Sequence, residues 1–314
     1  MKKLLLLFIP LLLLCGCQPK EQTQTAFFFD TVVTVTLPHD ADPSLFDKAW
    51  AICADYQQTF DRFSEKSELS RLSTTPTIVS EETAEVLTEA LRLKDATNGA
   101  FDIRLGRLSD LWNQETLPDA DAILNALKEA QDTQVVIDGT TVTLIGKGQL
   151  DLGGIAKGYV TDRLAELFHS EGCESALLNL GGNVYCLGTK QGKPFRVGID
   201  TLMDQPDPPI LALSNQCAVT AGVNQRYKII DGVRYHHILN PQTGVPAKTD
   251  LISATIVADS ATLADALSTA CIVLGQKKAE ELLKQFPDVS AVLVSENGTV
   301  TTVRDPLFVN SAQK

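Results

Sequence analysis

The chain has 314 residues, of which 44% are hydrophobic and 21% are charged, and its formal net charge is −12. This composition is that of a globular protein with enough apolar material for one large domain or two intimate ones. The acidic balance argues against nucleic acid as a partner, because phosphate contacts require clustered lysine and arginine side chains.

The first 17 residues have the pattern of a secretory signal. Lys2 and Lys3 precede an apolar run at 4–14, which is shorter than the roughly 20 residues that a bilayer-spanning helix needs. The run ends in Leu-Cys-Gly-Cys17, which resembles a bacterial lipobox. We expect 1–17 to be a lipoprotein signal peptide, and Cys17 to carry a lipid that anchors the protein to a bacterial membrane on its extracytoplasmic side. An ordinary signal peptide with a coincidental cysteine is the alternative.

The remaining chain is expected to form a polar tether at 18–25, without apolar periodicity, and a domain at 26–314. Apolar periodicity predicts helices, in chain order, at 43–62, 81–98, 119–131, 159–169, 261–274 and 276–285. Alternating or β-branched runs predict strands at 29–37, 135–137, 141–145, 176–180, 195–199, 216–220, 227–230, 235–239, 251–258, 291–294 and 300–303. Strands and helices mix without strict βαβ alternation, so the predicted class is α+β, with mixed, largely antiparallel sheets and packed helices.

Five cysteines remain beyond the signal, and they are scattered singly without a C-x-x-C pair. This spacing argues against a zinc site or thiol redox chemistry. We expect the five to be buried small hydrophobic residues, and the sequence leaves one disulfide open.

A glycine-rich segment at 150–159 (LDLGGIAKGY) joins a strand end to the start of a helix. Gly153 and Gly154 let the backbone approach a ligand closely, the helix start presents free N–H groups, and Lys157 adds positive charge. The spacing is neither that of a Walker loop nor that of a dinucleotide-binding fingerprint. The segment is a candidate anion site, with a tight turn onto a packed helix as the alternative.

The helix expected after Ser260 carries polar side chains among small apolar ones. Asp265 and Thr269 stand at i and i+4, with Ser268 close by. Their oxygens suit a hard cation such as Mg²⁺, which retains waters and often bridges phosphates. A solvent-facing aspartate beside a threonine bonded to its own helix is the alternative.

Two further segments carry candidate ligand contacts. His236 and His237 are neighbours on an expected strand and so are not expected to serve one site. One histidine there is a candidate for touching phosphate or moving a proton, with a structural turn as the alternative. Phe63, and Phe101 within Gly-Ala-Phe-Asp102, are candidates for stacking on a flat ring, with core packing as the alternative.

Taken together, these segments resemble the ApbE family of extracytoplasmic FAD:protein FMN transferases. The resemblance depends on five blocks: 151–159 (DLGGIAKGY), 181–183 (GGN), 220–222 (TAG), 237–244 (HILNPQTG) and 264–269 (ADALST). It covers nearly the whole chain from residue 29 to about residue 275, and it implies a T-fold-like flavin transferase architecture.

The resemblance implies a reaction and a site. FAD would be cleaved between its phosphates with Mg²⁺, FMN joined to a Thr or Ser hydroxyl of an extracytoplasmic flavoprotein, and AMP released. The implied metal ligands are Asp265, Thr269, Ser268 and the Gly154 carbonyl oxygen. The implied FAD contacts are Phe29, Phe63, Ala100, Phe101, Asp102, Asp151, Lys157 and Leu239. His237 and Asp265 are the candidates for taking the proton of the acceptor hydroxyl.

Several positions depart from the family pattern. None of the departures removes an implied metal ligand, although they put individual FAD contacts in question. Arg104 and Arg107 stand where the family has Thr and Pro, so they are candidates for additional anion contacts. The others are Phe29, Asp30, Ala221, Asn224 and Asn240.

Two other functions remain open from the sequence. The first is a Mg²⁺-dependent FAD pyrophosphatase, in which water replaces the acceptor hydroxyl. The second is a non-catalytic FAD-binding lipoprotein, which would have little need of a metal at the scissile bond.

Overall fold

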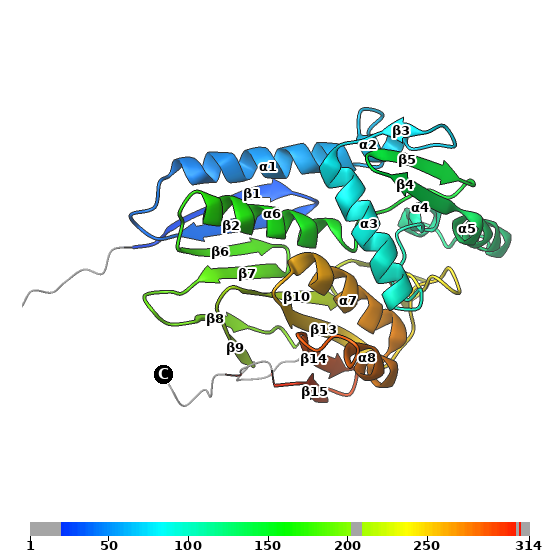
Figure 1. The fold of residues 1–314 in the computed structure, drawn as a ribbon. Helices are drawn as coiled ribbons and strands as arrows, with labels where there is room; N and C mark the ends of the chain where they lie inside the picture. The colour runs from blue at the N-terminus through cyan, green and yellow to red at the C-terminus, as the bar shows by residue number, and fades with distance from the viewer. Residues whose placement is uncertain (1–19, 202–208, 306–307, 309–314) are drawn as a thin grey trace, which may run out of the picture.

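A computed structural model describes residues 20–201, 209–305 and 308. Its centre is an eight-stranded antiparallel sheet in the order β1-β2-β6-β7-β10-β13-β14-β15 (Figure 1). The strands are β1 (Gln22–Phe28), β2 (Thr31–Leu37), β6 (Ser175–Leu180), β7 (Asn183–Gly188), β10 (Gln216–Gly222), β13 (Leu251–Ala258), β14 (Ser290–Ser295) and β15 (Val300–Val303). The α+β class and the antiparallel sheet predicted from the sequence are confirmed.

Four helices pack on one face of this sheet: α1 (Ser44–Phe60), α6 (Ala156–Ser170), α7 (Ala261–Leu274) and α8 (Gln276–Leu283). The alternation of β2 explains this, because Val33, Val35 and Leu37 are buried against the helices while their neighbours are more exposed. The opposite face is covered in part by the hairpin of β8 (Phe195–Gly198) and β9 (Ile210–Leu213).

The chain between α1 and α6 forms a smaller layer beside the helices. It contains α2 (Glu68–Arg71), β3 (Thr77–Ile78), α3 (Glu81–Ala96), α4 (Gly106–Asn113), α5 (Ala120–Asp132), β4 (Gln134–Asp138) and β5 (Thr141–Ile145). A separate hairpin of β11 (Tyr227–Ile230) and β12 (Val233–His236) follows β10. In the part of the chain that the structure describes, no helix is both long and apolar enough to cross a membrane.

One end of the large sheet gathers the turns that carry the sequence motifs. The Phe29–Asp30 turn joins β1 to β2, the Gly181–Gly182 turn joins β6 to β7, and β10 ends beside them. Both residues of the first turn have positive φ, 52° and 56°, as a two-residue hairpin turn that matches strand twist requires.

Helices α6 and α7 cross at Gly158, which lies in the first turn of α6. A Cβ built there would lie 2.3 Å from the Ala261 carbonyl oxygen and 2.8 Å from the Asp265 Cβ. The Asp162 carboxylate then accepts hydrogen bonds from the first turn of α7, at Ala261 N and Thr262 N. Helix packing therefore requires a glycine at position 158 of the LDLGGIAKGY segment.

Most predicted elements are confirmed within a few residues, and three predictions are wrong. Residues 22–25 of the expected tether belong to β1, which pairs through its backbone at the sheet edge and needs no apolar alternation. The strand expected at 235–239 ends at His236, because the His236 ring bonds Ile238 N and the Ala247 carbonyl oxygen and turns the chain. Strands β1, β3, β7 and β9 and helices α2 and α4 were not predicted as such.

Two other predictions concern cysteines and the signal. All five cysteines beyond the signal are free and buried, as expected of small hydrophobic residues. The signal peptide and Cys17 lie outside the described residues.

Substituting Gly158→Ala should destabilise the fold. The methyl group would push α6 and α7 apart at a backbone contact, so we expect the free energy of unfolding to fall by about 1–3 kcal/mol. This outweighs the gain of up to ~1 kcal/mol in helix propensity. Urea unfolding measures the difference, and Gly198→Ala is the matched control, because a Cβ there meets nothing within 4 Å. Equal stability of the two variants would show that the crossing is not close-packed.

Candidate active site

A cavity of about 1400 Å³ opens at the end of the sheet where these turns gather. Its walls come from the β1–β2 turn, the end of α1, the loops before α4 and α6, the start of α6, the β6–β7 turn, the end of β10, the β11–β12 hairpin and the middle of α7. All eight predicted FAD contacts line it: Phe29, Phe63, Ala100, Phe101, Asp102, Asp151, Lys157 and Leu239. The fold thus brings together residues that are up to 210 positions apart in the chain.

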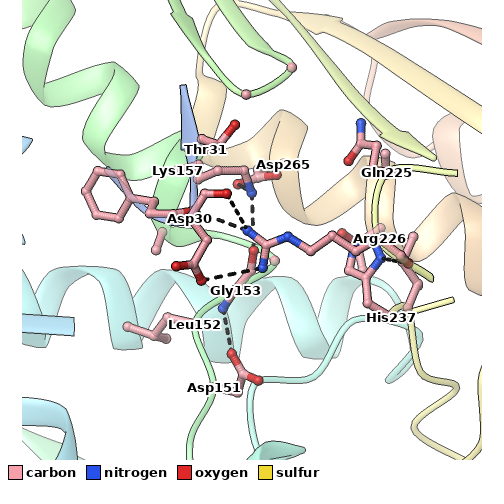
Figure 2. A pocket seen from close by; sticks show the side chains of 18 of the residues that line it. Asp30, Thr31, Asp151, Leu152, Gly153, Lys157, Gln225, Arg226, His237 and Asp265 are labelled. Atoms are coloured by element: carbon pink, nitrogen blue, oxygen red, sulfur yellow. Dashed lines mark hydrogen bonds and ion pairs between the residues drawn. The ribbon is translucent and has the colours of Figure 1, made fainter. Parts of the chain in front are cut away.

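Asp265 is the buried carboxylate of this cavity, with only 5% of its surface exposed. Its Oδ2 accepts a hydrogen bond from Gly158 N at 3.0 Å. The same oxygen lies 3.8 Å from Nζ of Lys157, which is beside Asp265 in Figure 2. Among the described residues, none donates a hydrogen bond to Oδ1. Oδ2 therefore links α7 to α6 where the two helices cross, and Oδ1 is left for a ligand.

Thr269 and Gly154 lie next to this carboxylate. A Cβ built on Gly154 would be 3.4 Å from Thr269 Oγ1, so the loop before α6 touches α7 here. The Thr269 hydroxyl has no hydrogen-bond partner in the described chain, whereas Thr88 and Thr161 bond back to their own helices. The alternative of a back-bonded threonine is therefore wrong for Thr269.

These three groups fit a magnesium ion. Mg²⁺ takes oxygen ligands, retains several waters, and is bound through one or two carboxylates together with substrate phosphates. Asp265 Oδ1, Thr269 Oγ1 and the Gly154 carbonyl oxygen, which accepts no hydrogen bond from a described residue, are such a partial set. No group of three or more His, Cys, Asp or Glu side chains suited to a metal occurs in the described residues, so this site would rely on substrate and water for the rest.

Ser268, the fourth predicted metal ligand, does not reach the cavity. Its side chain is fully buried and donates to the Asp265 carbonyl oxygen at 2.9 Å. Residues three apart on a helix are neighbours, but here the helix rotation turns Ser268 into the core while Thr269 lines the cavity.

Arg104 and Arg107 do not provide the additional anion contacts expected from the sequence. Arg104 forms a bidentate pair with Asp102, at 2.9 Å and 2.6 Å, and also donates to the Thr133 carbonyl oxygen. Arg107 pairs with Glu129 at 3.1 Å. Because both guanidinium groups are used within the protein, they hold Asp102 and the α5 end in place.

Phe63 forms an open stacking platform. Its side chain is 70% exposed, and the Arg62 guanidinium lies 4.1 Å from its ring centroid. Arg62 is itself held by Asp110 at 2.5 Å and lies 3.7 Å from Asp151. The arginine supports one ring face and leaves the other available for a flat ligand ring.

The two histidines have different roles, and both border the cavity because His237 lies past the end of the strand. The His236 ring uses both nitrogens, Nε2 on the Ala247 carbonyl oxygen and Nδ1 on Ile238 N, so it is structural. His237 Nδ1 lies 3.0 Å from the Arg226 carbonyl oxygen and must donate to it, which leaves Nε2 unprotonated.

Although part of His237 is exposed to the cavity, desolvation by the surrounding wall lowers its pKa to about 4, and the charges of Arg226 and Lys157 act in the same direction. The residue remains accessible from the cavity. Its imidazole is therefore neutral at pH 7 and able to accept a proton at Nε2.

Arg226 is the main site residue that the sequence did not reveal. Its guanidinium crosses the cavity mouth to the carbonyl oxygens of Phe29 and Asp30, at 3.2 Å and 3.4 Å (Figure 2). Its own carbonyl oxygen accepts from both His237 N and His237 Nδ1. It lies between two recognised blocks, and no local pattern distinguishes an arginine that bridges distant turns.

Comparison of the sequence with known protein families shows which family this chain belongs to. The family model described as "ApbE family" matches residues 29–293. The chain belongs to the ApbE family. The predicted ApbE-like architecture of packed helices and antiparallel sheets is confirmed by a solved structure.

Curated relatives of this chain are described as "FAD:protein FMN transferase". That from Treponema pallidum is 39% identical over 242 residues, 70% of this chain and 67% of the relative. That from Vibrio cholerae is 32% identical over 298 residues, 88% of this chain and 89% of the relative. The ApbE protein of Thermotoga maritima superposes with a TM-score of 0.82 at 30% identity, over 91% of this chain and 97% of that one.

The His237 ring of this ApbE protein should titrate near pH 4, far below the ordinary value of 6.5. Between these values the unfolded chain binds more protons than the folded one, so the free energy of unfolding should fall as pH drops through this window. NMR of the imidazole nitrogens measures the titration. His237→Gln should remove part of the pH dependence in urea unfolding, and a ring that titrates at or above 6.5 would contradict this assignment.

Proposed function

We propose that this protein is a Mg²⁺-dependent flavin transferase that moves FMN from FAD to a Thr or Ser hydroxyl of an extracytoplasmic flavoprotein and releases AMP. The observation that carries the proposal is the pair of Asp265 Oδ1 and the Thr269 hydroxyl, neither of which has a hydrogen-bond partner among the described residues, within a cavity that also holds an aromatic platform and a helix start. The names of the curated relatives support the same reaction.

Binding of FAD would use Lys157 for the phosphates and Phe63 for a flat ring. Lys157 lies in the first turn of α6, where free N–H groups and the helix dipole favour an anion, so it suits the pyrophosphate. Phe63 would take a flat ring against the face opposite Arg62. Phe101 and Leu239, which are buried, would form the apolar floor of the cavity.

The metal would be held by Asp265, Thr269 and the Gly154 carbonyl oxygen. When bound, Mg²⁺ neutralises negative charge on phosphate oxygens and stabilises the charge that develops during phosphoryl transfer. An acidic protein that handles a pyrophosphate has particular need of such a cation.

His237 would act as the general base. Its Nε2 accepts the proton of the acceptor hydroxyl as the oxygen attacks the FMN phosphorus. A new P–O bond to the acceptor forms, and the bond from that phosphorus to the bridging oxygen breaks. AMP leaves with the bridging oxygen, so the products are an FMN–protein phosphoester and AMP.

The anchoring at Cys17 belongs to the same proposal, and the lipobox-like start supports it. Strand β1 begins at Gln22, so the chain between Cys17 and the sheet spans at most about 18 Å. The seven residues of β1 then run roughly 20 Å to the Phe29–Asp30 turn at the cavity. The cavity would therefore open at the end of the sheet that lies away from the anchor.

The deciding experiment is mass spectrometry of a candidate acceptor domain after incubation with this protein, FAD and Mg²⁺, with AMP and FMN assayed alongside. A gain of one FMN on a Thr or Ser, abolished by EDTA, supports the transferase. Free FMN and AMP in the absence of any mass gain, with several acceptors, would instead indicate a pyrophosphatase. FAD that stays intact while bound would indicate a binding protein.

Asp265→Asn should lower the rate of FMN transfer by roughly 100-fold or more, because the carboxylate charge is lost at the metal. The amide oxygen still accepts from Gly158 N, so the melting temperature should change little. AMP release measures the rate. Asp259→Asn, at an exposed carboxylate just before α7, is the control with the same charge change and should keep full activity. Full activity in Asp265→Asn would refute the metal site.

Thr269→Val should raise the Mg²⁺ concentration for half-maximal activity by roughly 10-fold. The substitution preserves shape and removes only a hydroxyl that has no partner in the described chain, so stability in the absence of Mg²⁺ should not fall. Activity against Mg²⁺ concentration, and the Mg²⁺-dependent rise in melting temperature with FAD present, both report the change. Thr269→Ser keeps the hydroxyl and should resemble wild type; equal Mg²⁺ dependence in all three proteins would exclude Thr269 as a ligand.

A further inference from the structure

Strand β8 has one edge that no described residue pairs with. It forms a two-stranded sheet with β9, in which Val197 is opposite Leu211 and Gly198 is opposite Ile210. Ile199 N donates to the Pro209 carbonyl oxygen, and antiparallel hydrogen-bonded pairs alternate along a strand. The N–H and C=O groups of Phe195 and Val197 therefore face β9, and those of Arg196 and Gly198 face the open edge.

This open edge borders the reaction cavity. Val197, Gly198 and Ile199 all line it. A Cβ built on Gly198 meets nothing within 4 Å, so space is available beside the strand at this point. The unpaired backbone groups of Gly198 are thus accessible from the same cavity that contains Asp265 and His237.

The cavity is larger than one ligand requires. Small-molecule sites usually measure about 300–1,000 Å³, and this one measures about 1400 Å³. The residues assigned to FAD belong to the β1–β2 turn, the segment just after α1, the loops at 100–102 and 151–157, and Leu239. The part near β8 has other walls, which carry one carboxylate, Asp200, among otherwise uncharged residues: Asn179, Val184, Val197, Ile199 and Ala218, with Gly181 and Gly182.

We propose that the acceptor protein docks as an extended, uncharged segment along the open edge of β8, with its Thr or Ser hydroxyl directed into the cavity. This inference rests on the proposed function, because a transferase must hold FAD and a second substrate at once. Backbone hydrogen bonds to Arg196 and Gly198 would give affinity, as in other cases of strand addition. The small uncharged wall residues favour a segment with small side chains.

A second copy of this chain is a poor occupant of the same edge. Antiparallel pairing of two β8 edges in the register centred on Arg196 would place two arginine side chains opposite each other, and like charges across strands are destabilising. The strand is also only four residues long, which limits edge-to-edge association. A substrate segment that supplies no charge avoids this repulsion.

Gly198→Pro tests the docking edge. Proline removes the outward N–H and fills the edge, and it keeps the bonds from β8 to β9 because those come from other residues. The matched control is Thr302→Pro on β15, which is an edge strand of the large sheet. Ser295 N donates to the Thr299 carbonyl oxygen, so by the same alternation the Thr302 N–H also faces outward, and Thr302 does not line the cavity.

The measurement is steady-state FMN transfer to a purified extracytoplasmic acceptor domain, together with the dissociation constant for FAD. We expect Gly198→Pro to raise the KM for the acceptor at least tenfold while FAD affinity changes less than threefold, and Thr302→Pro to match wild type. An unchanged acceptor KM in Gly198→Pro overturns the docking proposal alone. Failure of wild type to transfer FMN to any acceptor overturns the proposed function, and the docking proposal with it.

Discussion

The close crossing of α6 and α7 is the constraint on which the site depends. Gly158 lets the two helices meet at backbone distance, and its N–H donates to Asp265 Oδ2. The same contact sets Lys157 at the start of α6 next to the carboxylate, and brings the Gly154 loop against Thr269. A buried carboxylate requires a partner. Here the partner is a backbone N–H, and it satisfies one oxygen only. The packing of the fold and the chemistry of the site therefore use the same aspartate.

The antiparallel sheet gives the site its position. Hairpin turns return the chain to the same end of the sheet, so the Phe29–Asp30 turn, the Gly181–Gly182 turn and the end of β10 meet there. The helices close that end from one face and the β8–β9 hairpin approaches from the other. The result is a cavity with two kinds of wall, one charged and aromatic and one largely uncharged. Such an asymmetry suits a reaction that joins a nucleotide to a polypeptide.

Charged groups in the cavity wall are mostly paired with one another. Arg62 is held by Asp110, Arg104 by Asp102, and Arg226 by the β1–β2 turn. These pairs fix side chains that would otherwise be mobile, which preorganises the cavity without leaving large unbalanced charge in an acidic protein. His237 is fixed in the same way, since the Arg226 carbonyl oxygen determines which ring nitrogen carries the proton. Asp265 Oδ1, Thr269 Oγ1 and His237 Nε2 have no hydrogen-bond partner among the described residues.

The sequence by itself determined the α+β class, most strands and helices, the family and the eight candidate FAD contacts that line the cavity, because periodicity and short motifs are local properties. It predicted Thr269 and Asp265 together, since i and i+4 share a helix face. It did not separate Ser268 from them, because the rotation of α7 is set by packing against α6 and the sheet. It placed Arg104 among anion contacts, since nothing local shows that Asp102 takes up its guanidinium. Only the tertiary structure revealed three features: the edge strand β1, the contacts of Arg226 and the open edge of β8. Backbone pairing and contacts between distant turns produce no periodic pattern in the sequence.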